Sequence, residues 1–177
     1  MTVNLGPADK PASRSDYQAI ISTLPDKTVT TDYNKPHSGS MEWWGGGDDS
    51  LNNTLTRTID LTGKSSGSVS AWLQYNIENG YDYLYAEVST DGGANWAALD
   101  GTVDGQPIPR DGSDKPALTG TVDAYKKLSY PLDAYAGQKI QLRFRYQTDG
   151  GVAQKGFAAD EITVTADGAA LFSDNAE

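Results

Sequence analysis

The fold of this chain is decided by residues 139–147, KIQLRFRYQ. Every second side chain in this stretch is apolar, and the side chains between them are charged or carry an amide. Successive side chains of a β-strand point to opposite faces of the sheet, so this alternation predicts a strand that buries one face and exposes the other. Such half-buried strands are typical of antiparallel sheets.

Three other stretches repeat this alternation: TLTRTIDL at 54–61, VSAWLQYNI at 69–77 and DYLYAEVS at 82–89. Turns rich in glycine and aspartate separate the stretches, and no segment after Leu24 places apolar residues at helical spacing. We therefore predict an all-β sandwich of two antiparallel sheets with about eight or nine strands. The residues expected in its core include Leu73, Tyr75, Leu84, Val88, Leu142 and Phe144.

The 177-residue chain has 14 Lys and Arg against 24 Asp and Glu, which gives a net charge of −10. An acidic surface repels phosphate backbones, which argues against nucleic acid as a partner, and it leaves carboxylates available for hard cations. The chain has no cysteine, so disulfides and thiolate metal sites are excluded. No apolar run approaches the ~18 residues that span a bilayer, so we expect no membrane span.

Residues 1–25 carry proline, serine and charged side chains, which predicts a linker or a partly ordered N-terminal extension. The sandwich domain is expected at residues 26–168. Residues 1–25 also lack the apolar segment of a signal peptide, so we expect an exported protein to carry this chain as a piece of a longer precursor.

A motif at residues 88–96, VSTDGGANW, places Ser89, Asp91, Gly93 and Trp96 at the spacing of an Asp box. Sialidases repeat this hairpin motif on successive propeller blades, whereas it occurs once here and no repeat of 20–50 residues is visible. The aspartate of such a motif accepts hydrogen bonds from turn amides, and the glycine tolerates a positive φ. We therefore interpret Asp91 as a turn residue and not as a catalyst.

Residue types that carry catalysis are sparse in this chain. His37 is the only histidine, and it lies in a proline- and serine-rich loop, NKPHSGS, where we expect it to be solvated. A zinc peptidase helix needs two histidines, and a Ser-His-Asp triad needs one beside a nucleophile. The chain has no phosphate-binding loop or dinucleotide fingerprint. We predict that this segment is not an enzyme.

Two aspartates lie at strand positions whose parity, odd or even in the numbering, is that of the apolar, inward-facing residues. Asp160 shares the parity of the apolar residues that follow it in GFAADEITV, and Asp82 shares that of the apolar residues in DYLYAEVS. An inward carboxylate needs donors or a cation, because burying it unpaired costs several kcal/mol. Arg57, whose parity is also inward, would supply an ion pair. A calcium ion held together with Asp48 or Asp49 of the loop GGGDDSLNN is a second possibility, and exposure to water at the strand ends is a third.

Three segments carry a resemblance to a known family. They are SMEWWGGGDDSLNNTLTRTIDLTG at 40–63, YNIENGYDYLYAEVSTDGGANW at 75–96 and LDAYAGQKIQLRFRYQTDGGVAQKGFAADEITV at 132–164. In this order they resemble the MAM-like β-sandwich that follows the catalytic domain of immune inhibitor A-type secreted bacterial metallopeptidases. The ending, ALFSDNAE, resembles the linker that leads into a following module, so the resemblance implies a C-terminal linker at residues 169–177.

The resemblance implies a jelly-roll-like sandwich that is secreted, extracellular and non-catalytic, because the zinc motif of the family is missing here and belongs to a separate domain. Such an accessory domain would stabilise or position the peptidase catalytic domain of the same parent chain and would contact substrate or partner protein. Many sandwiches of this shape carry a structural calcium ion between an N-terminal loop and the last strand. Carried over to this chain, its ligands would be Gly47, Asp48, Asp49 and Asp160.

A carbohydrate-binding module of jelly-roll type is the alternative function. Exposed aromatic rings stack on the C–H faces of sugars, and the candidates for such a platform are Trp43, Trp44, Tyr81, Tyr83 and Tyr85. Adjacent residues of a strand face opposite ways, so at most one of the two tryptophans can join a given platform. The competing interpretation is structural, with one tryptophan in the core and the other packed on a loop.

Overall fold

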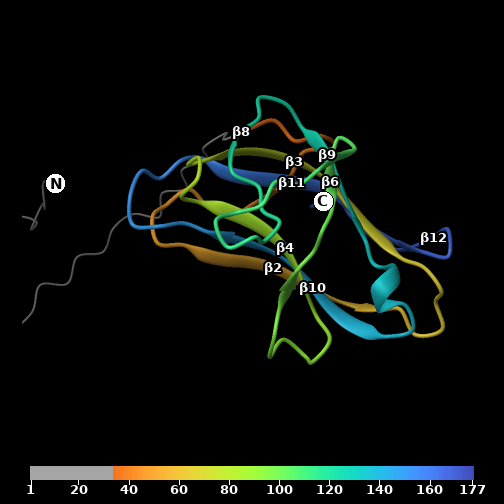
Figure 1. The fold of residues 1–177 in the computed structure, drawn as a ribbon. Helices are drawn as coiled ribbons and strands as arrows, with labels where there is room; N and C mark the ends of the chain where they lie inside the picture. The colour runs from red at the N-terminus through yellow and green to blue at the C-terminus, as the bar shows by residue number, and fades with distance from the viewer. Residues whose placement is uncertain (1–33) are drawn as a thin grey trace, which may run out of the picture. The chain divides into compact units, whose positions relative to one another are not determined.

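The computed structural model describes residues 34–177, so the extension predicted at residues 1–25 lies outside the described residues. Within them the chain forms two layers of antiparallel strands (Figure 1), as the alternating stretches predict. Five of the strands have only two residues, which accounts for a total above the expected eight or nine. The strands are β1 (Trp43–Trp44), β2 (Asn52–Asp60), β3 (Ser68–Ile77), β4 (Tyr83–Ser89), β5 (Ala97–Ala98), β6 (Thr102–Val103), β7 (Gln106–Pro107), β8 (Gly120–Thr121), β9 (Lys126–Pro131), β10 (Lys139–Gln147), β11 (Gly156–Ala166) and β12 (Ala169–Asp174).

The two sheets differ in size. The larger sheet follows the order β1-β11-β3-β9-β6-β7, with β12 also paired to β11 and β8 to β3. The smaller sheet follows the order β2-β10-β4-β5. Figure 1 shows β3, β9 and β11 in one layer and β2, β4 and β10 in the other. The chain therefore crosses repeatedly between the layers, and loops that are distant in sequence meet at the ends of the sandwich.

The core lies between the two sheets and is built by the alternating strands. All six residues that the sequence predicts there are buried, so the assignment of inward faces in β3, β4 and β10 is confirmed. Tyr146 of β10 is fully buried, and its ring meets that of Phe157 in β11 edge-on, with 5.8 Å between the ring centres. Each apolar side chain removed from water in this way stabilises the fold by roughly 25 cal/mol for each Å² buried.

The outer face of β4 is buried as well, because charged residues of β10 cover it. Glu87 is 5% exposed and accepts hydrogen bonds from Arg143 Nε at 2.7 Å and from Arg145 Nε at 2.9 Å. Burial acts to raise the pKa of Glu87, but hydrogen bonds and charges from Arg145 and Arg143 outweigh that effect and lower the pKa below its usual value. Alternating polar residues in these strands therefore form a packed ion-pair network and not merely a solvated face.

The C-terminal residues correct the prediction of a linker at 169–177. Residues 169–174 form β12, which pairs antiparallel with β11. The carboxylate of Glu177 then accepts hydrogen bonds from the backbone amide and hydroxyl of Ser40. The tight turn before β12 contains Asp167 and Gly168, both with positive φ, which lets the chain reverse and extend the sheet. This segment is part of the sandwich.

A β-bulge in β11 changes which side chains point inward. Asp160 pairs with Trp72 and Thr163 pairs with Ser70, so three steps along β11 correspond to two steps along β3. One extra residue is therefore accommodated, and Glu161 has a φ of +48°. Before the bulge the inward residues have odd numbers, as Ala159 opposite Leu73 shows. After the bulge they have even numbers.

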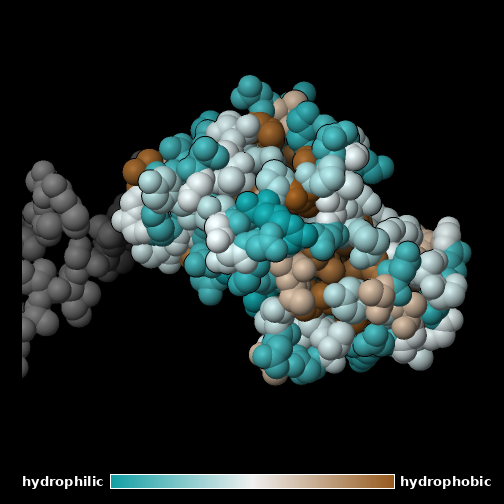
Figure 2. All heavy atoms as spheres, viewed as in Figure 1, coloured by the Kyte–Doolittle hydropathy of each residue, from teal (hydrophilic) through white to brown (hydrophobic). Residues whose placement is uncertain are grey.

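The face of the molecule drawn in Figure 2 is mainly polar. Figure 2 shows mostly hydrophilic or neutral residues on the face in view, with apolar residues in small patches. No helix in residues 34–177 is long and apolar enough to cross a membrane.

Candidate functional site

Three carboxylates gather at one end of the sandwich, where three strands begin or end. Glu78 follows β3, Asp82 precedes β4, and Asp149 lies two residues after β10. One carboxylate oxygen from each lies within 4.8 Å of those of the other two. Asp82 is fully buried, Glu78 is half-buried, and Asp149 is exposed. We call this group the acidic cluster.

Backbone hydrogen bonds hold the acidic cluster in place. The Asp82 amide donates to the Glu78 carbonyl at 3.1 Å, which closes the turn between β3 and β4. The Asp149 amide donates to Oδ1 of Asp82 at 2.9 Å, and the Gly151 amide donates to Oδ1 of Asp149 at 2.9 Å. Oδ2 of Asp82 is enclosed and meets no donor of the described residues in hydrogen-bonding geometry, although the Tyr146 hydroxyl is close enough to act on this carboxylate.

The electrostatic environment of the cluster is negative. Burial is the main cause that raises the pKa of Asp82, and the charges of Asp149 and Asp49 raise it further, while the Asp149 amide and the nearby Tyr146 hydroxyl act to lower it. Burial also raises the pKa of Glu78, with added repulsion from Asp149 and Asp82. None of the ion pairs between described residues involves these three carboxylates.

The glycine-rich loop between β1 and β2 is fastened beside this cluster. Thr148 accepts a hydrogen bond from the Leu51 amide at 2.7 Å and donates one to the Asp48 carbonyl at 3.0 Å. Asp48 and Asp49 are exposed, and Gly47 is half-buried. The loop therefore lies near Asp82. The hypothesis of a calcium ion held by Asp82 together with this loop requires that proximity.

Asp160 does not lie with Asp48 and Asp49. β1 runs antiparallel to β11, so the chain moves from Ala159 toward Gly156, and away from Asp160, as it approaches the glycine-rich loop. A Cβ on Gly156 would lie 1.8 Å from the carbonyl oxygen of Gly46, so this close approach requires a glycine. The four ligands carried over from the resemblance, Gly47, Asp48, Asp49 and Asp160, are therefore not brought together.

The prediction that Asp160 points into the core is also wrong, because the bulge reverses parity between it and Ile162. Asp160 lies on the outer face of the larger sheet, and its complete burial results from the segment around Ser38 that covers it. Its carboxylate accepts hydrogen bonds from the Ser38 amide at 2.7 Å and the Glu161 amide at 2.7 Å. Arg57 is not its partner, since the Arg57 guanidinium lies 3.6 Å from the ring centre of Phe172.

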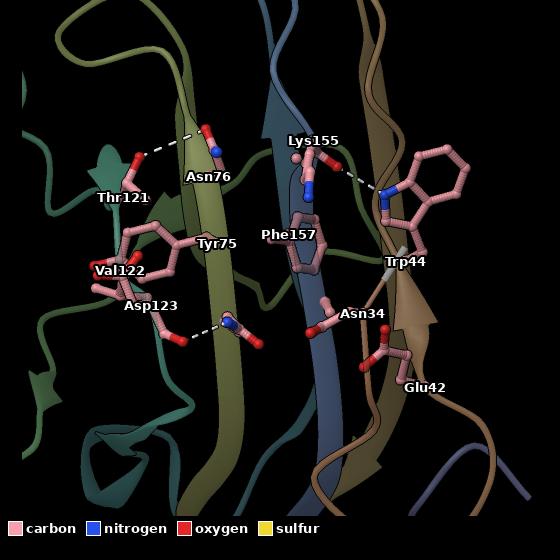
Figure 3. Close-up of a pocket in the computed structure, with 13 residues that line it drawn as sticks. Asn34, Glu42, Trp44, Tyr75, Asn76, Thr121, Val122, Asp123, Lys155 and Phe157 are labelled. Atoms are coloured by element: carbon pink, nitrogen blue, oxygen red, sulfur yellow. Dashed lines mark hydrogen bonds between the residues drawn. The ribbon is translucent and has the colours of Figure 1, made fainter. Parts of the chain in front are cut away.

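A polar groove beside Trp44 is the second candidate site. Figure 3 shows side chains from β1, β3 and β11 and from the loop after β8 around it, with Trp44 on one side and Asp123 on the other. The Trp44 indole is 52% exposed and donates to the Lys155 carbonyl at 2.9 Å. The groove encloses about 180 Å³, which is below the ~300–1,000 Å³ typical of small-molecule pockets.

The other aromatic candidates do not join Trp44 in one platform. Trp43 points to the opposite side of β1, is 41% exposed and donates to Asp174 at 3.2 Å. Tyr83 belongs to the other sheet, and its hydroxyl donates to the Gly80 carbonyl at 2.8 Å, which stabilises the turn. Tyr81 is exposed at the tip of that turn. Neither tryptophan is a core residue, so the structural interpretation of the pair is wrong in that respect.

Asp91 holds a turn, as its motif predicts. Its carboxylate accepts hydrogen bonds from the Ser89 hydroxyl at 2.7 Å and the Asn95 amide at 2.9 Å. The hydrogen bonds from Asn95 and Ser89 lower the pKa of Asp91 to about 2. Trp96 closes the motif by donating to the Gly93 carbonyl at 2.9 Å.

His37 is packed more closely than its loop sequence suggests. Its ring stacks on Trp72 with 4.1 Å between ring centres, and Nδ1 lies 3.6 Å from a carboxylate oxygen of Glu161.

Comparison with known proteins shows which family this sandwich belongs to. A family model described as "Immune inhibitor A-like, MAM domain" matches residues 9–177. The chain belongs to this family. The resemblance seen in the three sequence segments is thereby confirmed, and the fold described above is that of an immune inhibitor A-like MAM domain.

Individual relatives of this MAM domain are much longer proteins. The pre-pro-metalloprotease PrtV of Vibrio cholerae is 32% identical over 157 residues, which cover 88% of this chain and 16% of that protein. Immune inhibitor A of Bacillus thuringiensis subsp. alesti is 31% identical over 175 residues, covering 96% of this chain and 23% of that protein. The chain therefore spans about a sixth to a quarter of the length of these relatives.

Sequence reasoning missed two members of the acidic cluster, Glu78 and Asp149. Both were hidden by their position in turns, where acidic residues are common and ordinarily solvated. A usable signal was present nonetheless, because each lies one or two residues beyond the end of an alternating strand. β10 pairs antiparallel with β4, so the end of β10 lies beside the start of β4 and brings Asp149 to Asp82, whereas Glu78 follows a strand of the other sheet.

Proposed function

We propose that this chain is a non-catalytic accessory domain of a secreted bacterial zinc metallopeptidase, in which it stabilises or positions the catalytic domain and contacts substrate or partner protein. The observation that carries the proposal is the pair of matches at 31–32% identity, in which nearly all of this chain corresponds to a small part of a long protein, one of them by name a metalloprotease. Most of each relative lies outside the match and has room for a catalytic domain.

The chemistry of the chain supports the same proposal. A peptidase zinc site takes several His or carboxylate ligands in an open tetrahedral arrangement. The single histidine, His37, stacks on Trp72, and its Nδ1 faces Glu161. That arrangement suits packing of the segment over the larger sheet better than it suits catalysis.

The contact surface of the accessory domain is the hollow at the edge of the sandwich between β2 and β12. Its lining is largely apolar and includes Trp43, Leu55 and Phe172, with Arg57 and Asp174 among its polar members. Exposed apolar surface of this kind marks protein–protein contacts. We assign its occupant to another segment of the same parent protease, because a domain fused to a larger chain meets that chain at high effective concentration.

The proposal is tested in two steps. The purified chain should hydrolyse neither casein nor gelatin, and chelator-sensitive proteolysis by rigorously purified chain would contradict the proposal. The parent protease should lose thermal stability or activity when this domain is deleted. Retention of both after deletion would exclude a stabilising or positioning role.

The second candidate function is a carbohydrate-binding module, and the exposed Trp44 indole beside the polar groove favours it. The adjacent tryptophans provide a matched pair of variants, since Trp43 lines the apolar hollow and Trp44 lines the groove. If the accessory role holds, Trp43→Ala should weaken the stability of the parent protease more than Trp44→Ala does. Binding on a glycan array that is lost in Trp44→Ala and kept in Trp43→Ala would instead establish the sugar-binding role.

A further inference from the structure

The fully buried carboxylate of Asp82 lacks a partner for one of its oxygens. Oδ1 accepts the Asp149 amide, whereas Oδ2 is enclosed, and the nearby Tyr146 hydroxyl does not meet it in hydrogen-bonding geometry. A buried carboxylate with an unsatisfied oxygen is costly, because its charge is removed from water without compensation. Such a group points to a ligand that the protein atoms do not supply.

The neighbours of Asp82 identify the chemical class of that ligand. Glu78 and Asp149 each place a carboxylate oxygen within 4.8 Å of that of Asp82. The charge of Asp49 also raises the pKa of Asp82. Three or four negative charges at one position repel an anion and favour a cation. The donors are all oxygens, with no histidine or cysteine among them, which selects a hard ion over zinc or copper.

We infer that Glu78, Asp82 and Asp149 bind one calcium ion at this end of the sandwich. Calcium ligands lie about 2.3–2.6 Å from the ion, so two oxygens on opposite sides of it are roughly 4.6–5.2 Å apart. Oxygens that share one calcium ion can lie no farther apart than this, and every pair in the acidic cluster, at 4.8 Å or less, is within that limit. Magnesium, with ligands at about 2.0–2.1 Å in a strict octahedron, usually keeps several waters and so suits a site of three protein carboxylates less well.

The remaining ligands are also at hand. Three carboxylates offer up to six oxygens, of which Oδ1 of Asp82 and Oδ1 of Asp149 are already engaged with backbone amides. Calcium takes six to eight oxygens and accepts water, so the half-exposed cluster completes the shell from solvent or from Asp49.

The ion would join turns that no covalent cross-link connects. Glu78 and Asp82 bracket the turn between β3 and β4, and Asp149 lies in the loop between β10 and β11. The Asp149 carbonyl also accepts a hydrogen bond from the Ser50 amide, so the loop between β1 and β2 is tied to the same place. The chain has no cysteine. Calcium thus takes the part that a disulfide plays in other small sandwiches.

The test uses the purified full chain, melted with excess calcium, excess magnesium or chelator, together with calcium titration by calorimetry. Calcium should raise the melting temperature above that in chelator, and magnesium should raise it less. Asp149→Asn, at an exposed position that leaves the core intact, should weaken calcium binding by about tenfold or more, because one ligand charge is lost.

Asp82→Asn gives the sharpest result, because its effect on the melting temperature should change sign between chelator and calcium. In chelator the variant should melt at or above the wild-type temperature, since an unpaired buried charge has been removed. In calcium it should melt below the wild type, because the ion no longer binds. Asp160→Asn, a buried carboxylate outside the cluster, is the matched control and should keep the calcium shift.

Two results would overturn the inference. The first is identical melting in calcium and in chelator with no heat of binding. The second is a calcium shift that survives unchanged in both Asp82→Asn and Asp149→Asn, which would place any bound ion elsewhere.

Discussion

The backbone amide of Ser38 donates a 2.7 Å hydrogen bond to Oδ2 of Asp160, and so joins two positions that are 122 residues apart in the sequence. The Ser38 hydroxyl and the Glu161 amide donate to the same carboxylate. Asp160 is fully buried on the outer face of the larger sheet, beneath the segment that contains Ser38. Its carboxylate therefore has donors of its own and fastens the start of the described chain to β11.

The first prediction concerns this attachment. Asp160→Ala should lower the free energy of unfolding by about 1–3 kcal/mol, because part-buried backbone donors would be left without an acceptor. The loss should be the same in calcium and in chelator, since Asp160 is outside the acidic cluster. Denaturant unfolding in both conditions measures it. A loss that appears only in calcium would return Asp160 to the list of metal ligands.

The second prediction separates Arg57 from Asp160. Arg57 is exposed, and its guanidinium packs 3.6 Å from the ring centre of Phe172. An exposed cation–π contact contributes about 0.5–1 kcal/mol, so Arg57→Met should cost no more than that in a thermal or denaturant melt. If Arg57 were instead the partner of a buried carboxylate, its removal would cost several times as much.

The sandwich could be predicted from the sequence because the alternation of apolar and polar residues that indicates each strand lies within that strand. Alternation in 139–147 fixes which side chains of β10 point inward, and Leu142 and Phe144 are buried as expected. Parity failed in β11 because a single extra residue at the bulge reverses the faces on either side of it. The sequence GFAADEITV gives no sign of the bulge. The residue with a positive φ there is Glu161, whereas a glycine would have indicated an irregular backbone.

The candidate site could be predicted only in part, because it is assembled from turns. Asp82 was found by its parity with Leu84, and its burial confirms that inference. Glu78 and Asp149 meet it only when β3, β4 and β10 have taken their places in two different sheets. Such contacts depend on strand order, which the alternation of a single chain does not specify. The segment around Ser38 that buries Asp160 was missed for the same reason.

The third prediction concerns the turn held by Asp91. Asp91→Ala should lower the melting temperature at neutral pH, because amide and hydroxyl donors in the turn lose their acceptor. Since the pKa of Asp91 is lowered to about 2, the wild-type advantage is present above the ordinary aspartate pKa of about 3.9 and is lost as pH falls toward 2. Melts of the variant at several pH values, beside the exposed control Asp123→Ala, test this expectation. An equal effect of both substitutions would show that the turn contributes nothing special.

The last prediction concerns the buried carboxylate between two arginines. Glu87→Gln keeps the shape of the side chain but leaves Arg143 and Arg145, whose side chains are only 19% and 13% exposed, without their counter-charge. Removing one partner of a buried ion pair is strongly destabilising, and we expect a loss on the order of 3 kcal/mol at neutral pH. Denaturant unfolding measures it, with Asp123→Ala again as the control.

The dependence on pH gives this prediction a second test. The pKa of Glu87 is lowered in the folded chain, so its contribution is complete above the unfolded value of about 4.3 and is lost as pH falls through the folded value. The difference between wild type and Glu87→Gln should therefore shrink on acidification below about pH 4. A difference that stays constant from neutral to acid pH would mean that packing, and not charge, makes Glu87 important. In that case Glu87→Met would be tolerated better than Glu87→Gln, because its side chain would fill the same space without a polar group to satisfy.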